Sequence, residues 1–403
     1  MRELALHGKT PVIADKAQAW PIWDEREEKN LLRALEAGEW GTLGSQVRMF
    51  SRRFADYIGV KHCICVNSGA QGLEILLRGA GIGYGDEVVA PSYAYAAAAS
   101  AIAMVGAAPV FADIEADTGC IDPESVDRSI TASTKAILAV HFAGRPCDMD
   151  ALKAIASRRG VLLLEDASHA YGSKWRGKRA GSLAHGAVFG CQHGMDLTAG
   201  EGGLIVTDDE ELYAGCWHFH NSGRSLESSS ALGGRVLMGT NGRMSEWAAA
   251  ILDAQLNRLD EMRKLREKNA ALLLKRLRAL KGLLLPKEDS RITENNRFLL
   301  PLRILPDVLG MTRNAFMATV NARGVPLFTG HAPMHSSPML TSSVFAKSTG
   351  KRVRVSETHL PRTDHWREAC VYLPGRALLT SPAGIERISD SFEMVVRRQT
   401  EAC

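Results

Sequence analysis

The sequence predicts an α/β protein with a large domain, built on a mostly parallel seven-stranded sheet, and a smaller α+β C-terminal domain. From about residue 60 to residue 206, short apolar or β-branched runs alternate with helix-length segments, which is typical of a parallel sheet covered by helices. After residue 244, a long stretch with apolar residues at helical spacing leads into a region of short apolar runs and prolines. We therefore expect a large domain at 1–256 and a smaller one at 257–403.

Seven segments are expected to form the sheet. The predicted strands cover residues 62–66, 87–90, 108–111, 136–140, 161–165, 187–191 and 203–206. Helices are expected at 71–80, 96–105, 149–158 and 244–280. Ligands of open parallel sheets bind at the carboxyl ends of the strands, so the residues that follow each strand are the first candidates for a site.

Composition and charge argue against several classes of function. The chain has 403 residues, of which 45% are hydrophobic and 23% charged, as in ordinary globular proteins. The net charge of +4 is dispersed, so no nucleic-acid partner is expected. No signal peptide and no long apolar stretch occur, and we expect a soluble, cytoplasmic protein without a membrane segment. The eight cysteines form no CxxC pair, so no metal site is predicted.

A turn that can bind an anion is the first candidate for chemistry. Gly69 and Ala70, in the segment NSGAQG, follow a predicted strand and open a predicted helix. Free backbone N–H groups and the positive end of the helix dipole meet there, and both attract an anion. A tight turn that needs glycine explains the same residues equally well.

Further candidates follow the ends of other strands. Asp166 closes the strand VLLLED, where a carboxylate can either meet a ligand or cap a helix. Tyr95, in PSYAY, can form one face of a flat slot or pack against a helix. The glycine-rich loop 192–203 connects two apolar strands and contains His193 and Asp196, and such loops usually line a site.

The order and spacing of these motifs resemble the DegT/DnrJ/EryC1/StrS family of sugar and cyclitol aminotransferases, especially its 3-amino-5-hydroxybenzoate synthase branch. The resemblance runs nearly end to end and includes the segments WPIWDEREEKN, GDEVVAPSYAY, GAAPVFADI, LLLEDASHAYGSKWRGKRAGSLAHGAVF, LTAGEGGLIVTDDEEL and GTNGRMSEW. It implies the fold-type I, aspartate-aminotransferase-like fold of enzymes dependent on pyridoxal phosphate (PLP). It also implies a role in amino-sugar or antibiotic biosynthesis.

The resemblance implies a role for individual positions. Asp166 matches the carboxylate that pairs with the pyridine nitrogen of the cofactor, and His169 matches a position close to the ring. Tyr95 matches an aromatic residue that stacks on the ring. Gly69 and Ala70 match the turn that binds the phosphate.

The resemblance also implies an assembly and a class of substrate. Asn241, in GTNGRMSE, matches an amide that reaches the cofactor phosphate from the neighbouring subunit. A homodimer with a shared active site is therefore expected, acting on a small-molecule sugar, cyclitol or aromatic precursor. The two histidines of the stretch 327–335, His331 and His335, fall in a family loop near the substrate. They either contact ligand or face solvent.

The chain departs from the family at the cofactor loop. The family reads approximately FSFQxGKxxTAGEGG, whereas residues 189–203 read FGCQHGMDLTAGEGG. Met195 occupies the position of the lysine that holds the cofactor, and a thioether can neither make that covalent link nor move a proton. Gly190 and Ala70 replace a serine and a threonine that bond the phosphate. At about 1.5–3 kcal/mol for each bond, their loss weakens cofactor binding by roughly a hundred- to ten-thousandfold.

Three functions fit this pattern. The first is an enzyme that uses PLP or pyridoxamine phosphate (PMP) non-covalently on a keto sugar or cyclitol, as the lysine-less sugar 3-dehydratases of the family do, with His193 or Asp196 as the catalytic base. The second is a cofactor-free acid–base enzyme of natural-product biosynthesis. Its titratable groups would be Asp166, His169, His193, Asp196 and Glu201. The third is an inactive partner of a paralogue that keeps the lysine. We favour the first, because backbone N–H groups, the helix end and Asn241 can still hold the phosphate.

Overall fold

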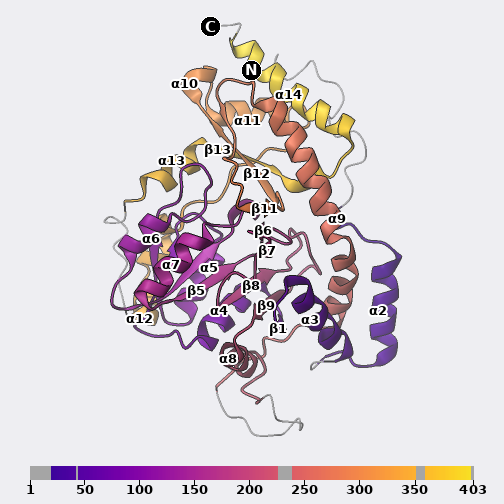
Figure 1. The fold of residues 1–403 in the computed structure, drawn as a ribbon, viewed down its shortest axis with the longest axis vertical. Coiled ribbons are helices and arrows are strands. Elements are labelled where there is room, and N and C mark those ends of the chain that lie inside the picture. The colour runs from indigo at the N-terminus through magenta and orange to yellow at the C-terminus, as the bar shows by residue number, and fades with distance from the viewer. Residues whose placement is uncertain (1–19, 42–43, 226–237, 351–358, 401–403) are drawn as a thin grey trace.

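A seven-stranded sheet is the central feature of the computed structural model, which describes residues 20–41, 44–225, 238–350 and 359–400 (Figure 1). Its order is β1-β9-β8-β5-β4-β2-β3; β9 is antiparallel to both neighbours and the other strands run parallel. The predicted fold class is confirmed, and each predicted strand end lies within two residues of the observed one. The strands are β1 His62–Val66, β2 Glu87–Pro91, β3 Ala108–Ala112, β4 Thr134–Val140, β5 Leu162–Asp166, β8 Gly186–Gly190 and β9 Gly203–Thr207.

Helices cover both faces of this sheet because the strands are apolar on both sides. In β1, Cys63 and Cys65 belong to one core, whereas Ile64 and Val66 belong to the other. The first core also contains residues of α3 (Ser45–Ile58), α6 (Pro123–Ser129) and α7 (Met149–Arg159). The second contains residues of α4 (Gly69–Gly79), α5 (Ala97–Met104) and α8 (Glu210–His220).

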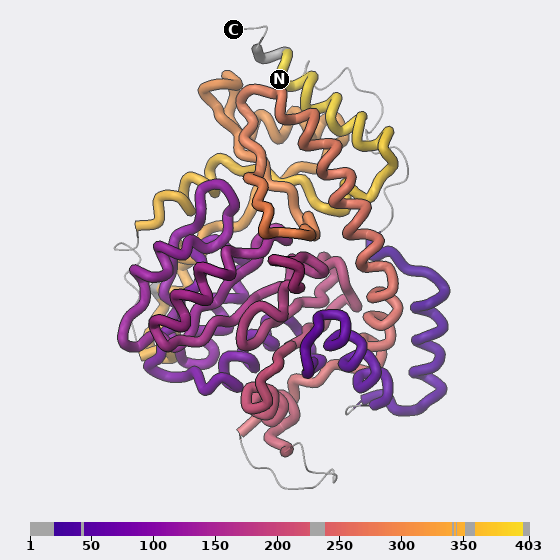
Figure 2. Tube along the Cα trace, viewed as in Figure 1, coloured from indigo at the N-terminus to yellow at the C-terminus, as the bar shows by residue number. Residues whose placement is uncertain are grey.

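A 32-residue helix, α9 (Glu246–Leu277), connects the sheet with the C-terminal region (Figures 1 and 2). Its first half packs against α2 (Glu25–Ala37) and α3, and its second half enters a separate apolar core that begins at Ala270. The predicted boundary between residues 256 and 257 thus falls inside α9. No helix in the described ranges is both long and apolar enough to cross a membrane.

The C-terminal region contributes both its own core and a cover for the sheet domain. Leu340, Phe345 and Leu360 pack into the core around α4 and α5. A small sheet in the order β11-β6-β7 joins the two parts of the chain. The remaining elements are β6 Lys174–Trp175, β7 Lys178–Arg179, β10 Leu283–Leu284, β11 Ile292–Glu294, β12 Leu299–Ile304, α10 Pro306–Leu309, α11 Arg313–Asn321, α12 Ser343–Thr349, α13 Pro361–Ala369, β13 Cys370–Pro374 and α14 Pro382–Thr400.

Candidate functional site

A cavity of about 550 Å³ lies at the carboxyl edge of the sheet, where parallel sheets bind their ligands. Segments that follow β1, β2, β4, β5 and β8 form one side of it, and residues from the C-terminal region form the other. The structure brings most of the sequence-predicted site residues to this cavity, and they are Gly69, Ala70, Tyr95, Asp166, His169, Gly190, Met195, Asp196, Glu201 and His331.

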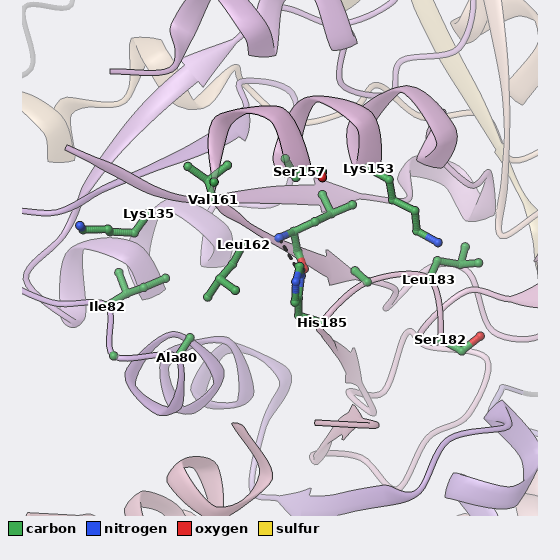
Figure 3. A pocket seen from close by; sticks show the side chains of 15 residues that line it. Ala80, Ile82, Lys135, Lys153, Ser157, Val161, Leu162, Ser182, Leu183 and His185 are labelled. Atoms are coloured by element: carbon green, nitrogen blue, oxygen red, sulfur yellow. Dashed lines mark hydrogen bonds between the residues drawn. The ribbon is translucent and has the colours of Figure 1, made fainter. Parts of the chain in front are cut away.

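A second hollow of about 750 Å³ lies at the opposite edge of the sheet, beside the amino ends of β4 and β5 (Figure 3). Lys135 and Lys153 lie on different sides of it and do not point toward one another. The ring of His185 is engaged by the backbone N–H of Leu163, 3.1 Å from Nδ1. None of the sequence-predicted site residues lines this hollow. The polar groups therefore converge at the carboxyl edge.

The N-terminus of α4 presents unused N–H groups to the cavity. Ser68 caps this helix, and its Oγ accepts the N–H of Gln71 at 3.1 Å. The N–H groups of Gly69 and Ala70 have no acceptor within the helix and remain for an anion. Glycine is required at position 69, because a Cβ there would lie 2.8 Å from the Cα of Gly190.

Asp166 keeps one carboxylate oxygen for a ligand. Its Oδ1 accepts both the N–H of Ser168, at 3.1 Å, and the hydroxyl of Ser168, at 2.6 Å. Ser168 Oγ in turn accepts the N–H of Gly190 at 3.0 Å. No donor among the described residues bonds Oδ2. Burial raises the pKa of Asp166, while the bonds from Ser168 oppose this rise. A cationic N–H partner in the cavity would lower this pKa and favour the carboxylate form.

Aromatic and imidazole rings form the walls of the cavity. Tyr95 is 62% exposed, which leaves its ring free to contact a ligand. His169 stacks on Phe298 with 4.2 Å between ring centroids, and its buried Nδ1 has no hydrogen-bond partner in the part of the chain that the structure describes. Burial lowers the pKa of His169 to about 3, so this ring is neutral near pH 7. His331 meets Tyr95 edge-on at 5.4 Å, and burial lowers its pKa as well.

The cofactor loop places Met195 in the cavity wall, where it also packs against the core on one face of the sheet. None of the described residues that line the cavity is a lysine. Asp196 is buried, and both of its carboxylate oxygens are bonded, one by the fully buried Arg266 and the other by Asn296 Nδ2 at 2.5 Å. The ion pair and the amide bond therefore engage both carboxylate oxygens of Asp196 within the protein.

Three other predicted residues lie away from the cavity lining. His193 is exposed, and its carbonyl accepts the indole N–H of Trp20 at 2.8 Å. Asn241 is exposed on a β-bridge to Asn221, outside the cavity of its own chain. His335 is buried, with Nδ1 2.6 Å from the hydroxyl of Ser92.

Other lining residues, among them Ser168, Trp20, Phe298 and Arg376, were not predicted from the sequence. Ser168 stands two positions after Asp166, and that spacing is the only local signal for its role. Trp20, Phe298 and Arg376 reach the cavity from segments far apart in the chain. Trp20 opens the segment WPIWDEREEKN, which carries part of the resemblance but gave no sign of a place in the site, and no motif marks Phe298 or Arg376.

These residues fit a flat, anionic ligand with a basic ring nitrogen. The α4 amides suit a phosphate, Oδ2 of Asp166 suits a protonated ring nitrogen, and the Tyr95 ring suits a planar face. The unpartnered Nδ1 of His169 offers one further polar contact. The fold and this site define the class: the solved structures that the chain resembles are fold-type I, PLP-dependent aminotransferases.

The chain belongs to the DegT/DnrJ/EryC1/StrS aminotransferase family, whose sequence profile matches residues 21–393. It is 36% identical over 380 residues to an L-glutamine:2-deoxy-scyllo-inosose aminotransferase of Streptoalloteichus tenebrarius, and the aligned part covers 90% of this chain and 87% of that protein. It is 34% identical over 388 residues to the 3-amino-5-hydroxybenzoate synthase of Amycolatopsis mediterranei, covering 96% and 98%. The resemblance found in the sequence is thus confirmed.

Solved structures show the same relationship. A crystal structure of 3-amino-5-hydroxybenzoic acid synthase matches with a TM-score of 0.85 and 34% identity over 94% of this chain and 98% of the other. The structure of DesI in the presence of its TDP-sugar product matches with a TM-score of 0.81 and 31% identity, covering 96% and 94%.

Proposed function

We propose that this chain holds PLP or PMP without a covalent bond and acts on a small cyclic ketone in amino-sugar or antibiotic biosynthesis. One observation carries the proposal: the cavity keeps the groups that suit the cofactor, while no lysine lines its wall among the described residues. Met195 stands in that wall at the position where the resemblance places the lysine of the family. The relatives named for a cyclitol ketone and for an aminohydroxybenzoate support this class of substrate.

Each end of the cofactor has a group to hold it. The amides of Gly69 and Ala70 would bind the phosphate, and Asp166 Oδ2 would bind the pyridine nitrogen and keep it protonated. Ser168 fixes the orientation of Asp166 through two hydrogen bonds. Bound there, PMP supplies an electron-withdrawing ring and the primary amine that this cavity lacks.

The imidazole of His331 is best placed to move a proton. It lines the cavity beside Tyr95, and its lowered pKa keeps it neutral near pH 7, as a general base requires. Asp196 is bound by Arg266 and Asn296. Its carboxylate therefore holds the loop 192–203 in place and does not act as the base. His193 lies outside the lining, and a catalytic role there would require the loop to move.

The proposal includes a homodimer in the cytoplasm. Asn241 is exposed and lies outside the lining of its own cavity, which suits an amide that completes the site of a second copy. The assembly would then be needed for cofactor binding, and Asn241→Ala would weaken binding without unfolding the chain.

A titration with PMP tests the proposal. Purified protein should show saturable binding by absorbance and by quenching of its tryptophan fluorescence, to which Trp20 in the cavity wall contributes, and Asp166→Ala should abolish it. Asp208→Ala, at an exposed position outside the cavity, is the matched control. No saturable binding at millimolar PMP would overturn the proposal and favour a cofactor-free acid–base enzyme.

A further inference from the structure

Glu201 carries the one carboxylate of the cavity wall that no described residue engages. Its side chain is exposed, and no ion pair or hydrogen bond within the described part of the chain includes it. The two other acids of the wall are occupied: Asp196 is paired with Arg266. Asp166 accepts two hydrogen bonds from Ser168 and keeps its other oxygen for a ring nitrogen. Glu201 is therefore the acid that remains for a second cationic group of a ligand.

The backbone on both sides of Glu201 is fixed. Before it, the carbonyl of Gly200 accepts the N–H of His193 at 2.9 Å. After it, the carbonyl of Gly202 accepts the N–H of Cys191 at 2.8 Å. Gly200 and Gly202 have φ angles of +84° and +145°, which glycine adopts without strain. These bonds across the base of the loop hold Glu201 at one place in the wall.

Glu201 and Met195 reach the cavity from the same loop, 192–203. The ion pair of Asp196 with Arg266 ties this loop to α9, so the loop is anchored from two sides. Where the resemblance places an amine, the wall has a thioether and, further along the loop, a free carboxylate. Because no lysine among the described residues lines the cavity, a positive charge beside this loop has to come from the ligand.

The two forms of the cofactor differ in charge at the carbon that a lysine would hold. PMP has a primary amine there, which is protonated near neutral pH, whereas PLP has a neutral aldehyde. An ammonium group has three N–H donors, and a carboxylate accepts them in charge-assisted hydrogen bonds. The α4 amides suit the phosphate and Asp166 suits the ring nitrogen, which leaves Glu201 for the ammonium group.

We infer that Glu201 binds the ammonium group of PMP and thereby makes the cavity prefer PMP to PLP. The inference rests on the proposed function, and it narrows that function from either form of the cofactor to the amine form. It also gives a purpose to the carboxylate that the protein leaves without a partner beside Met195.

Binding of two matched phosphates tests the inference. The probes are PMP and pyridoxine phosphate, which carries a neutral hydroxymethyl group in place of the aminomethyl group. Neither has an aldehyde, so neither reacts with lysines on the protein surface. Each is titrated calorimetrically into the wild type, Glu201→Gln and Glu211→Gln. Glu211 is the control because it is exposed in the first turn of α8, outside the cavity. Thermal unfolding of each variant verifies that it is folded.

The wild type should bind PMP at least about fivefold more tightly than pyridoxine phosphate, the upper end for an ion pair near the surface. Glu201→Gln should remove this difference by weakening the binding of PMP alone, and Glu211→Gln should keep it. Equal affinities in the wild type, or a preference that survives in Glu201→Gln, overturn the inference. An equal weakening of both ligands in Glu201→Gln also overturns it, because that result assigns Glu201 a structural role.

The same titrations separate the two claims. If the wild type binds neither phosphate, the proposed function fails and the inference fails with it. If the wild type binds both phosphates and Glu201→Gln leaves the affinity for PMP unchanged, the inference alone fails and the proposed function stands.

Discussion

Restoring one hydroxyl at the phosphate site should strengthen cofactor binding. In Gly190→Ser, the new Cβ would lie 3.5 Å from Ser168 Oγ and 3.8 Å from the Cα of Gly69, which are ordinary contacts. The Cβ of a serine therefore fits between these residues without moving either. One hydrogen bond to a charged phosphate contributes about 1.5–3 kcal/mol, so PMP should bind roughly 10- to 150-fold more tightly.

The assay is a fluorescence titration with PMP, repeated with pyridoxamine, which lacks the phosphate. Gly190→Ser should gain affinity for PMP alone. Gly69→Ala is the opposite control, because its Cβ would lie 2.8 Å from the Cα of Gly190 and should disrupt the turn. An unchanged PMP affinity in Gly190→Ser, or an equal gain for pyridoxamine, would refute the placement of the phosphate at α4.

Three further substitutions test the roles of single groups. Burial raises the pKa of Asp166, so its contribution to stability is complete below its unfolded pKa and is lost as the pH rises through the folded value. Asp166→Asn should therefore lose less melting temperature than the wild type as the pH rises above about 4, and an equal loss would contradict a buried acid with a raised pKa. The pKa of His169 is lowered to about 3, so the unfolded chain alone takes up this proton as the pH falls below about 6.5. His169→Gln should therefore remove about 2 kcal/mol of the stability lost between pH 6.5 and pH 5, measured by urea unfolding, and an unchanged loss would contradict a neutral buried ring. Met195→Lys should bind PLP covalently. Mass spectrometry after borohydride reduction should then find a PLP adduct on the introduced lysine. If this adduct does not form, the loop does not face the cofactor.

The strand ends could be predicted from the sequence because their signals are local. Asp166 and Gly69 each follow a run of apolar residues, and the topology of a parallel sheet gathers such positions at one edge. The exposed ring of Tyr95 reaches the same edge for the same reason. The family resemblance then gave each position an expected role.

The partners of the loop residues could not be predicted, because they come from distant segments. Asp196 reads as a free acid beside Met195, but the structure pairs it with Arg266 of α9. His193 lies outside the cavity lining although Gln192 and Gly194 on either side of it belong to that lining, a difference that local sequence does not determine. Arg376 has no motif around it, and its place in the cavity depends on the contact of Gly375 with Phe298.

The central claim is that the cofactor is held without a covalent bond. The most direct measurement is mass spectrometry of wild-type protein that has been saturated with PLP, reduced with borohydride and separated from free ligand, with PMP as a competitor. We predict that borohydride fixes PLP on no lysine of the cavity, so that adding PMP as a competitor removes no lysine adduct. We also predict that the bound cofactor is recovered free after denaturation. A lysine adduct that PMP abolishes would show that another amine serves the cavity, and it would contradict the account.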